Sequence, residues 1–283
     1  MTNTLPLSDD LSAHLAPTRL YSAYIFDLDG TVYLGEKLLP TAGQTIERLR
    51  AMGRRTVFLS NNPTYTREEM AHKLTRLGLP TPAEDVINSS LVMAHFLQRH
   101  LPGGRLFVIG EQPLLDVLGE AGFELTDDPA RIDAVIASFD RTFVYRKLQI
   151  AFDALRAGAR FFATNADRYC PVPGGGQPDA AAIIAAIEAC TGHTVEAVVG
   201  KPSLHMANAV LALVDAAPQD CIITGDRIET DVVMGLEAGM DAALTLTGAT
   251  QLDDALRFPL QPTYIIRRLG DLLPLQAVHS GAS

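Results

Sequence analysis

A buried strand that ends on two aspartates is the feature that most constrains this chain. Residues 23–26 form an apolar run typical of an inner strand of a parallel sheet. Asp27 and Asp29 follow, and side chains two residues apart on an extended chain point the same way. Gly30 then permits a sharp turn away from the sheet. Because open α/β sheets bind ligands beyond the carboxyl ends of their strands, the aspartate pair marks a candidate site.

The two carboxylates need a partner that offsets their charge. Two like charges about 4 Å apart repel by roughly 4 kcal/mol at an effective dielectric constant near 20. A metal cation, a lysine or a shared proton could offset that repulsion. A simple turn is the alternative interpretation, since Asp and Gly are both common turn residues. The aspartate pair alone does not decide between a site with a compensating partner and a simple turn.

Three further apolar runs also end on polar residues, and they lie at residues 56–59, 195–199 and 221–224. The first ends at Ser60 and the second runs into Lys201. The third is followed by Asp226 and, five residues later, by Asp231. In a parallel sheet the carboxyl ends of the strands share one edge, so we expect these side chains to lie near the aspartate pair.

Helical patterns separate the predicted strands. Ile46, Leu49 and Met52 would share one face of a helix that ends at Gly53. Thr66 with Glu69 three residues later predicts a capping box, and Thr230 is the expected N-cap of a later helix. Residues 242–246 and 264–266 are two final predicted strands. The alternation predicts an α/β fold with a doubly wound, mostly parallel sheet and right-handed crossovers.

The residue types at the strand ends suit phosphoryl transfer. Mg²⁺ prefers oxygen ligands and takes a few carboxylates. A carboxylate can act as a nucleophile and form an aspartyl-phosphate. A second carboxyl can give a proton to the leaving alcohol. An ammonium group and a hydroxyl can bind the oxygens of the transferred group.

These segments resemble the haloacid dehalogenase (HAD) superfamily of phosphohydrolases. The four motifs of that superfamily are Asp-x-Asp-x-Thr/Val, a Ser or Thr, a Lys, and a Gly-Asp pair followed by a further Asp. This chain supplies them in the same order, at Asp27-Leu28-Asp29-Gly30-Thr31, Ser60, Lys201, and Gly225-Asp226 with Asp231. Four motifs in order, each at a strand end, make the resemblance specific.

The resemblance implies a role for each of these residues. Asp27 would be the nucleophile and Asp29 the general acid and base. Ser60 and Lys201 would bind the transferred phosphoryl group, and Asn61 would lend its backbone N–H to the phosphate. The activity implied is that of a phosphomonoesterase that works through an aspartyl-phosphate.

The resemblance also implies a magnesium site. Mg²⁺ would be bound by Asp27, by the backbone carbonyl of Asp29 and by Asp226. Asp231 would orient either metal-bound water or Lys201. Asp29 favours a phosphatase over a dehalogenase, since a dehalogenase does not need that acid.

A long insertion separates the second and third motifs. Ser60 and Lys201 lie about 140 residues apart, whereas a crossover connection needs only a dozen or more. We expect a core domain of residues 1–98 and 196–283 and an inserted domain of residues 99–195. The insert carries predicted strands and helices, and it resembles the α/β C2-type cap of the type IIA branch. That branch includes NagD-like, p-nitrophenyl, phosphoglycolate and pyridoxal phosphatases.

Asp140 and Arg141 are candidate specificity residues in the insert. They follow a predicted strand at residues 134–137 and precede a helix. In cap-bearing relatives such a loop faces the active site and selects the leaving group, so Arg141 could hold a substrate anion. A solvated loop pair is the alternative.

Composition limits the partners and the compartment. The 283-residue chain carries a net charge of −10, which argues against nucleic acid as the main partner. No apolar run reaches 18 residues, so we expect no membrane span. The three cysteines show no metal-type spacing, and the N-terminus lacks the features of a secretory signal. We therefore expect a cytoplasmic protein with reduced thiols.

The substrate and the oligomeric state stay open at this point. Sugar phosphates, nucleotides, phosphoglycolate, pyridoxal phosphate and glycerol phosphate all fit a small phosphorylated metabolite. Two other functions are alternatives: a phosphomutase of the same superfamily, and a non-catalytic sensor of a phosphorylated metabolite. Relatives of this branch commonly dimerise through the cap, which favours a homodimer.

Overall fold

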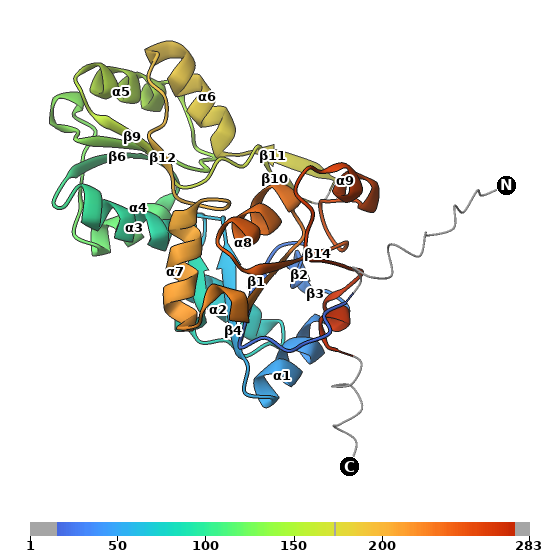
Figure 1. Ribbon diagram of the computed structural model, residues 1–283. Coiled ribbons are helices and arrows are strands. Elements are labelled where there is room, and N and C mark those ends of the chain that lie inside the picture. The colour runs from blue at the N-terminus through green and yellow to red at the C-terminus, as the bar shows by residue number, and fades with distance from the viewer. Residues whose placement is uncertain (1–15, 173, 275–283) are drawn as a thin grey trace. The chain divides into compact units, whose positions relative to one another are not determined.

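The computed structural model describes residues 16–172 and 174–274 (Figure 1). The chain forms two compact units. The first contains the chain up to Phe58, Leu77–Leu79 and the chain from Leu211 onward. The second contains Leu59–Arg76 and Pro80–Val210. The expected insert, residues 99–195, lies wholly within the second unit, and its status as a separate cap domain stays a prediction.

Parallel strands of apolar residues form the sheet that contains Asp27. Its strand order is β15-β14-β13-β1-β4-β5. The bounds are β1 Ala23–Asp27, β4 Arg55–Ser60, β5 Val86–Asn88, β13 Cys221–Gly225, β14 Asp241–Thr245 and β15 Tyr264–Ile266. Strands β1 and β13 pair in parallel with Phe26 opposite Thr224. Every residue of β1 and β13 is buried, as the continuous apolar runs predicted.

Short helices and turns complete the first unit. They are α1 Ala42–Ala51, η4 Pro218–Asp220, η5 Ile228–Val232, α8 Val233–Glu237, α9 Leu252–Arg257 and η6 Leu269–Leu272, with the small strands β2 Tyr33–Leu34 and β3 Lys37–Leu38. Helix α1 buries Ile46 and Leu49, and the chain leaves it through Gly53, whose φ is +69°. The predicted helix and its glycine end are confirmed. Helix α7, Leu204–Val214, belongs to both units.

The second unit is built on a five-stranded parallel sheet in the order β12-β9-β8-β6-β7. Its strands are β6 Arg105–Ile109, β7 Glu124–Leu125, β8 Ala134–Ala137, β9 Arg160–Ala163 and β12 Ala197–Val198, and a separate antiparallel hairpin pairs β10 Tyr169–Val172 with β11 Gly175–Pro178. Its helices and turns are α2 Arg67–Arg76, η2 Ala83–Asp85, α3 Ser89–His100, α4 Gln112–Glu120, η3 Pro129–Arg131, α5 Tyr145–Arg156 and α6 Ala180–Thr191.

Helices cover both faces of this second sheet. Figure 1 shows α5 and α6 on one side of β6, β9 and β12, and α3 and α4 on the other. Phe161 and Val135 of the sheet pack with Ile150 and Leu155 of α5 and Ile187 of α6 in one apolar cluster. The predicted α/β class with parallel sheets is therefore confirmed. The strand expected at residues 195–199 is β12, which pairs with β9 in this second sheet and is not part of the sheet that contains β1, so that expectation is wrong. No helix of the described residues is long and apolar enough to cross a membrane.

One predicted helix start is confirmed and one is wrong. Thr66 and Glu69 form the expected capping box, because each backbone N–H donates to the other's side chain, at 2.8 and 3.2 Å. Thr230 is not an N-cap. It lies inside the π-helical turn η5, which begins earlier because the N–H of Asp231 donates to the carbonyl of Arg227 at 3.0 Å.

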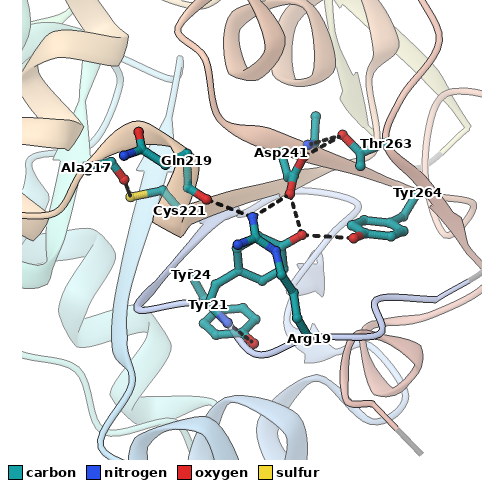
Figure 2. Close-up of polar contacts among 10 residues, drawn as sticks. Arg19, Tyr21, Tyr24, Ala217, Gln219, Cys221, Asp241, Thr263 and Tyr264 are labelled. Atoms are coloured by element: carbon teal, nitrogen blue, oxygen red, sulfur yellow. Dashed lines mark hydrogen bonds and ion pairs between the residues drawn. The ribbon is translucent and has the colours of Figure 1, made fainter.

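A polar cluster lies where β14 and β15 begin, at the end of these strands opposite the aspartate edge (Figure 2). Oδ2 of Asp241 accepts hydrogen bonds from Tyr21 Oη at 2.5 Å and from Arg19 at 2.9 Å. The hydroxyls of Tyr21 and Tyr264 lie 3.0 Å apart, and Thr263 donates to the other carboxylate oxygen. Desolvation, followed by the hydrogen bond to Asp241, raises the pKa of Tyr21. The cluster ties the segment before β1 to the sheet.

Candidate active site

Three carboxylates gather at one edge of the first unit's sheet. Asp27 is the last residue of β1, Asp226 directly follows β13, and Asp231 lies in η5. Each offers one oxygen, and these oxygens lie within 4.8 Å of one another. All three side chains are buried, with at most 7% of any residue exposed. The parallel pairing of β1 with β13 brings Asp27 and Asp226 together, because both strands end at the same edge.

Backbone hydrogen bonds hold the two later aspartates in place. Oδ2 of Asp226 accepts a hydrogen bond from the N–H of Ala249 at 2.6 Å. The backbone carbonyl of Asp226 accepts one from the N–H of Thr250 at 3.0 Å. Oδ2 of Asp231 accepts the N–H of Arg227 at 3.2 Å. A Cβ atom on Gly248 would lie 1.9 Å from Oδ2 of Asp226, so the loop after β14 approaches this carboxylate through a residue without a side chain.

The donor set of this cluster fits a hard divalent cation. Each pair of carboxylates at this spacing repels by about 3 kcal/mol at an effective dielectric constant near 20. Burial of three negative charges is unfavourable unless a positive charge compensates them. The oxygens are all carboxylate oxygens, which Mg²⁺ accepts and softer metals do not prefer. The residues present therefore suit the magnesium ion that the sequence predicts.

Asp29 is placed differently from Asp27. It is solvent-exposed, and its Oδ2 accepts the hydroxyl of Tyr33 at 3.3 Å. Tyr33 also forms an isolated β-bridge with Asp29, and the N–H of Gly30 donates to the Tyr33 carbonyl at 2.8 Å. The Asp29 carboxyl is thus held by the turn after β1 and stays open to solvent. An acid that exchanges protons with a leaving group and with water needs such access.

In the second unit, Ser60, Asn61 and Lys201 come together although their motifs lie far apart in sequence. Ser60 is the last residue of β4, and its Oγ accepts the N–H of Asn62 at 3.1 Å. The side chain of Asn61 bonds the backbone of Lys201 on both sides of its Cα atom. Ser60 and Lys201 are each 4% exposed. The Asn61 amide therefore joins the segment that follows β4 to the backbone of Lys201, and Ser60, Asn61 and Lys201 are all buried.

Asp140 and Arg141 do not pair with each other. The buried carboxylate of Asp140 accepts hydrogen bonds from Lys147 Nζ at 2.5 Å and from the backbone N–H of Thr142 at 2.8 Å. Arg141 is half-exposed and forms a bidentate ion pair with Glu111, at 2.7 and 2.6 Å. The hydrogen bond from Arg141 lowers the pKa of Glu111. Both charges of the predicted specificity pair thus have partners of opposite sign on neighbouring segments.

The carboxylate of Asp231 lies in the same cluster as those of Asp27 and Asp226, and its expected role in orienting metal-bound water or Lys201 stays a prediction. Its spacing of five residues after Asp226, at the start of a helix, was the available signal. Asp167 binds the side chain of Asn61, at 3.1 and 3.3 Å. No sequence pattern indicated this contact, because Asn61 and Asp167 lie 106 positions apart.

Comparison with protein families and with individual proteins identifies the same family that the sequence motifs resemble. The family described as haloacid dehalogenase-like hydrolase matches residues 24–124, and that described as HAD-hydrolase-like matches residues 198–272. The sugar-phosphatase AraL of Bacillus subtilis is 38% identical over 251 residues, which cover 89% of this chain and 92% of that protein.

Solved structures agree with the sequence comparison. A 4-nitrophenylphosphatase from Thermotoga maritima is 32% identical and superimposes with a TM-score of 0.85, covering 89% of this chain and 95% of the other. NagD from Escherichia coli K-12 is 30% identical with a TM-score of 0.83, covering 91% of this chain and all of NagD. The chain belongs to the HAD-like hydrolase family, and within it to the type IIA, NagD-like phosphatases. The predicted family and enzyme class are confirmed.

Proposed function

We propose that the protein is a Mg²⁺-dependent phosphomonoesterase that hydrolyses a small phosphorylated metabolite through an aspartyl-phosphate. The buried cluster of Asp27, Asp226 and Asp231 carries this proposal. It places one carboxylate at the end of β1, where a nucleophile is expected, and two more beside it. Three buried carboxylates whose oxygens lie within 4.8 Å of one another offer the kind of ligand that Mg²⁺ prefers, which supports the proposal.

The first step transfers the phosphoryl group to the protein. An oxygen of Asp27 attacks the phosphorus atom, and the bond from phosphorus to the ester oxygen breaks. Asp29 gives its carboxyl proton to the departing alkoxide, which leaves as an alcohol. Its exposed position after β1 supports this assignment.

The second step returns Asp27 to its starting state. The Asp29 carboxylate takes a proton from water as the water oxygen attacks the phosphorus atom. The bond from phosphorus to the Asp27 oxygen breaks, inorganic phosphate is released, and Asp29 is again protonated. One residue thus serves as acid in the first step and base in the second.

Ser60, Asn61 and Lys201 are proposed to bind the phosphoryl group. The Lys201 ammonium offers a point charge to the phosphoryl oxygens, and the Ser60 hydroxyl offers a hydrogen bond. The backbone N–H of Asn61 would add a further donor. Fixed donors of this kind stabilise charge as it develops in the transition state.

Asp27, Asp226 and the backbone carbonyl of Asp29 would hold the metal ion, with Asp231 as a further carboxylate beside them. When bound, Mg²⁺ would neutralise negative charge on the phosphoryl oxygens. The close approach of Gly248 and the N–H of Ala249 keep Asp226 in one orientation, which supports its assignment as a ligand.

A sugar phosphate is the first substrate class to test, because AraL, a sugar-phosphatase, is 38% identical to this chain. The predicted cap would close over the site, exclude bulk water and limit the size of the substrate. The loop of Asp140 and Arg141 would help select the leaving group. Since Glu111 already compensates Arg141, the loop is proposed to select by shape more than by free positive charge.

Three further expectations belong to this proposal. The reaction would take place in the cytoplasm, consistent with Cys170, Cys190 and Cys221, which form no disulfide. The net charge of −10 favours a small ligand over nucleic acid. The resemblance to the type IIA branch favours a homodimer formed through the cap.

The test is phosphate release from a panel of sugar phosphates, nucleotides, other phosphorylated metabolites and p-nitrophenyl phosphate. Each assay is run with Mg²⁺ and with a chelator. Metal-dependent release from one class is the expected result and identifies the leaving group. An isomerised product without free phosphate would point to a mutase, and binding without turnover would point to a sensor. Either result would overturn the proposal.

A further inference from the structure

The side chain of Asn61 lies against the backbone of Lys201 in a way that fixes one conformation. Oδ1 of Asn61 accepts the N–H of Lys201 at 2.7 Å, and Nδ2 donates to the carbonyl of Lys201 at 3.2 Å. These two groups belong to the peptide units on either side of the Lys201 Cα atom. One side-chain amide therefore restrains both backbone dihedrals of the lysine, and with them the direction in which its side chain leaves the chain.

Asp167 fixes which way the Asn61 amide points. Its two carboxylate oxygens lie 3.1 and 3.3 Å from Nδ2 of Asn61. A carboxylate only accepts hydrogen bonds and the Lys201 N–H only donates, so the amide satisfies both partners in a single orientation. Asn165 donates to Asp167 at 3.2 Å and to Asp179 at 3.2 Å, which holds the carboxylate in turn.

The three loops that meet here approach too closely for a side chain between them. A Cβ atom on Gly200 would lie 2.5 Å from the carbonyl oxygen of Thr164 and 2.7 Å from Oδ1 of Asn61. Asn61, Thr164 and Asn165 are all buried. The contact thus joins the segment after β4, the segment after β9 and the segment before α7, and water is largely excluded from its hydrogen bonds. Buried polar networks of this kind specify one arrangement when every member is satisfied.

We propose that Asn61 and Asp167 are positioning residues that hold Lys201 in the conformation that binds the phosphoryl group. The inference rests on the proposed function for the role of Lys201, and it assigns the Asn61 side chain a task separate from its backbone N–H. Asp167 follows β9, in the segment expected to form the cap. The conformation of the loop after β9 would therefore determine where the phosphate-binding lysine lies.

Binding of inorganic phosphate in the presence of Mg²⁺, measured by calorimetry, tests the inference without turnover. Asn61→Ala is expected to weaken phosphate binding at least about tenfold, and kcat/KM is expected to fall by up to about 10²-fold, as misplaced catalytic groups do. Asn88→Ala is the matched control. Asn88 is also buried, and its side chain makes two hydrogen bonds to backbone, but to Leu91 and Tyr65 instead of Lys201.

Two combined variants separate positioning from general destabilisation. Asn61→Ala added to Lys201→Ala is expected to bind phosphate no more weakly than Lys201→Ala alone, because Asn61 acts through the lysine. Asn61→Asp would place two carboxylates side by side and weaken binding, and Asn61→Asp with Asp167→Asn is expected to recover part of it. The exchange restores a donor–acceptor pair while the total charge stays the same.

The outcomes distinguish this inference from the proposed function. If the wild-type protein binds phosphate in an Asn61-dependent way but hydrolyses no ester, the proposed function fails and the inference stands. If the wild type is active while Asn61→Ala behaves like Asn88→Ala, the inference fails alone. Additive losses in the double variant, or no recovery on exchange, would also overturn it. A wild type that neither binds phosphate nor releases it from any ester would overturn both.

Discussion

Gly248 packs so closely on Asp226 that a Cβ atom at position 248 would lie 1.9 Å from the carboxylate oxygen Oδ2. The adjacent N–H of Ala249 donates to the same oxygen at 2.6 Å. Gly248→Ala must therefore displace either the loop or the carboxylate. We expect kcat/KM to fall by about 10²-fold in an assay of phosphate release.

Gly119→Ala is the control for this substitution. Gly119 lies in helix α4, and a Cβ atom there would meet nothing within 4 Å. Alanine is favoured over glycine in helices, so this variant should be slightly more stable and fully active. Equal activity of the Gly248→Ala and Gly119→Ala proteins would contradict the role given to Asp226.

The carboxylate cluster predicts a particular response to magnesium. Asp226→Asn removes one of three carboxylates whose oxygens lie within 4.8 Å of one another, so it should weaken the binding of Mg²⁺. Mg²⁺ should raise the melting temperature of the wild type, because it binds only the folded state, and should raise that of the variant much less. Thermal melts with Mg²⁺ and with chelator measure both effects. An equal Mg²⁺-induced rise in the two proteins would remove Asp226 from the metal site.

Removing a hydrogen bond from the polar cluster at the start of β14 and β15 is expected to lower stability without lowering activity. Tyr21→Phe removes the hydroxyl that donates to Asp241 at 2.5 Å and lies 3.0 Å from the Tyr264 hydroxyl (Figure 2). A hydrogen bond to a charged group contributes about 1.5–3 kcal/mol, so the free energy of unfolding in urea should fall by about that amount. Tyr145→Phe, at a side chain that is 78% exposed, should change little.

The pair of Asp133 and Arg105 is expected to make the free energy of unfolding depend on pH. Hydrogen bonds from Arg105 lower the pKa of Asp133 to about 2. The pKa of an aspartate in an unfolded chain is about 3.9. The interaction of Asp133 with Arg105 therefore stabilises the fold above that pH, and this stabilisation is lost as the pH falls toward 2. Asp133→Asn should therefore be less stable than the wild type at pH 7, by less than about 1 kcal/mol because the pair is partly exposed. Urea unfolding from pH 7 to pH 3 should show the difference shrink; a constant difference would contradict this assignment.

Local sequence patterns predicted the parallel strands well, because burial on both faces leaves a continuous apolar run. Strands β1, β13 and β15 follow such runs within a residue or two. Strand β5 was missed, since three residues are too few for a pattern. The hairpin of β10 and β11 was also not predicted, because its glycines are uncommon in strands.

The candidate site was predictable only in part. Asp27 and Asp226 could be placed at one edge because parallel strands share their carboxyl ends. The contact of Asn61 with Lys201 joins residues 140 positions apart, and no local pattern encodes such a pairing. The partner of Arg141 is another example, since Glu111 lies 30 residues away on a different loop.

Asp27 is proposed to carry the phosphoryl group during turnover. The most direct measurement is the mass of the protein after an acid quench during turnover with Mg²⁺ and a hydrolysed ester. A fraction of the wild-type protein is expected to gain one phosphoryl group, in the peptide that contains Asp27. Asp27→Asn should stay folded, gain none and release no phosphate. Phosphate release by Asp27→Asn at the wild-type rate, with no phosphorylated protein in either sample, would contradict the covalent mechanism.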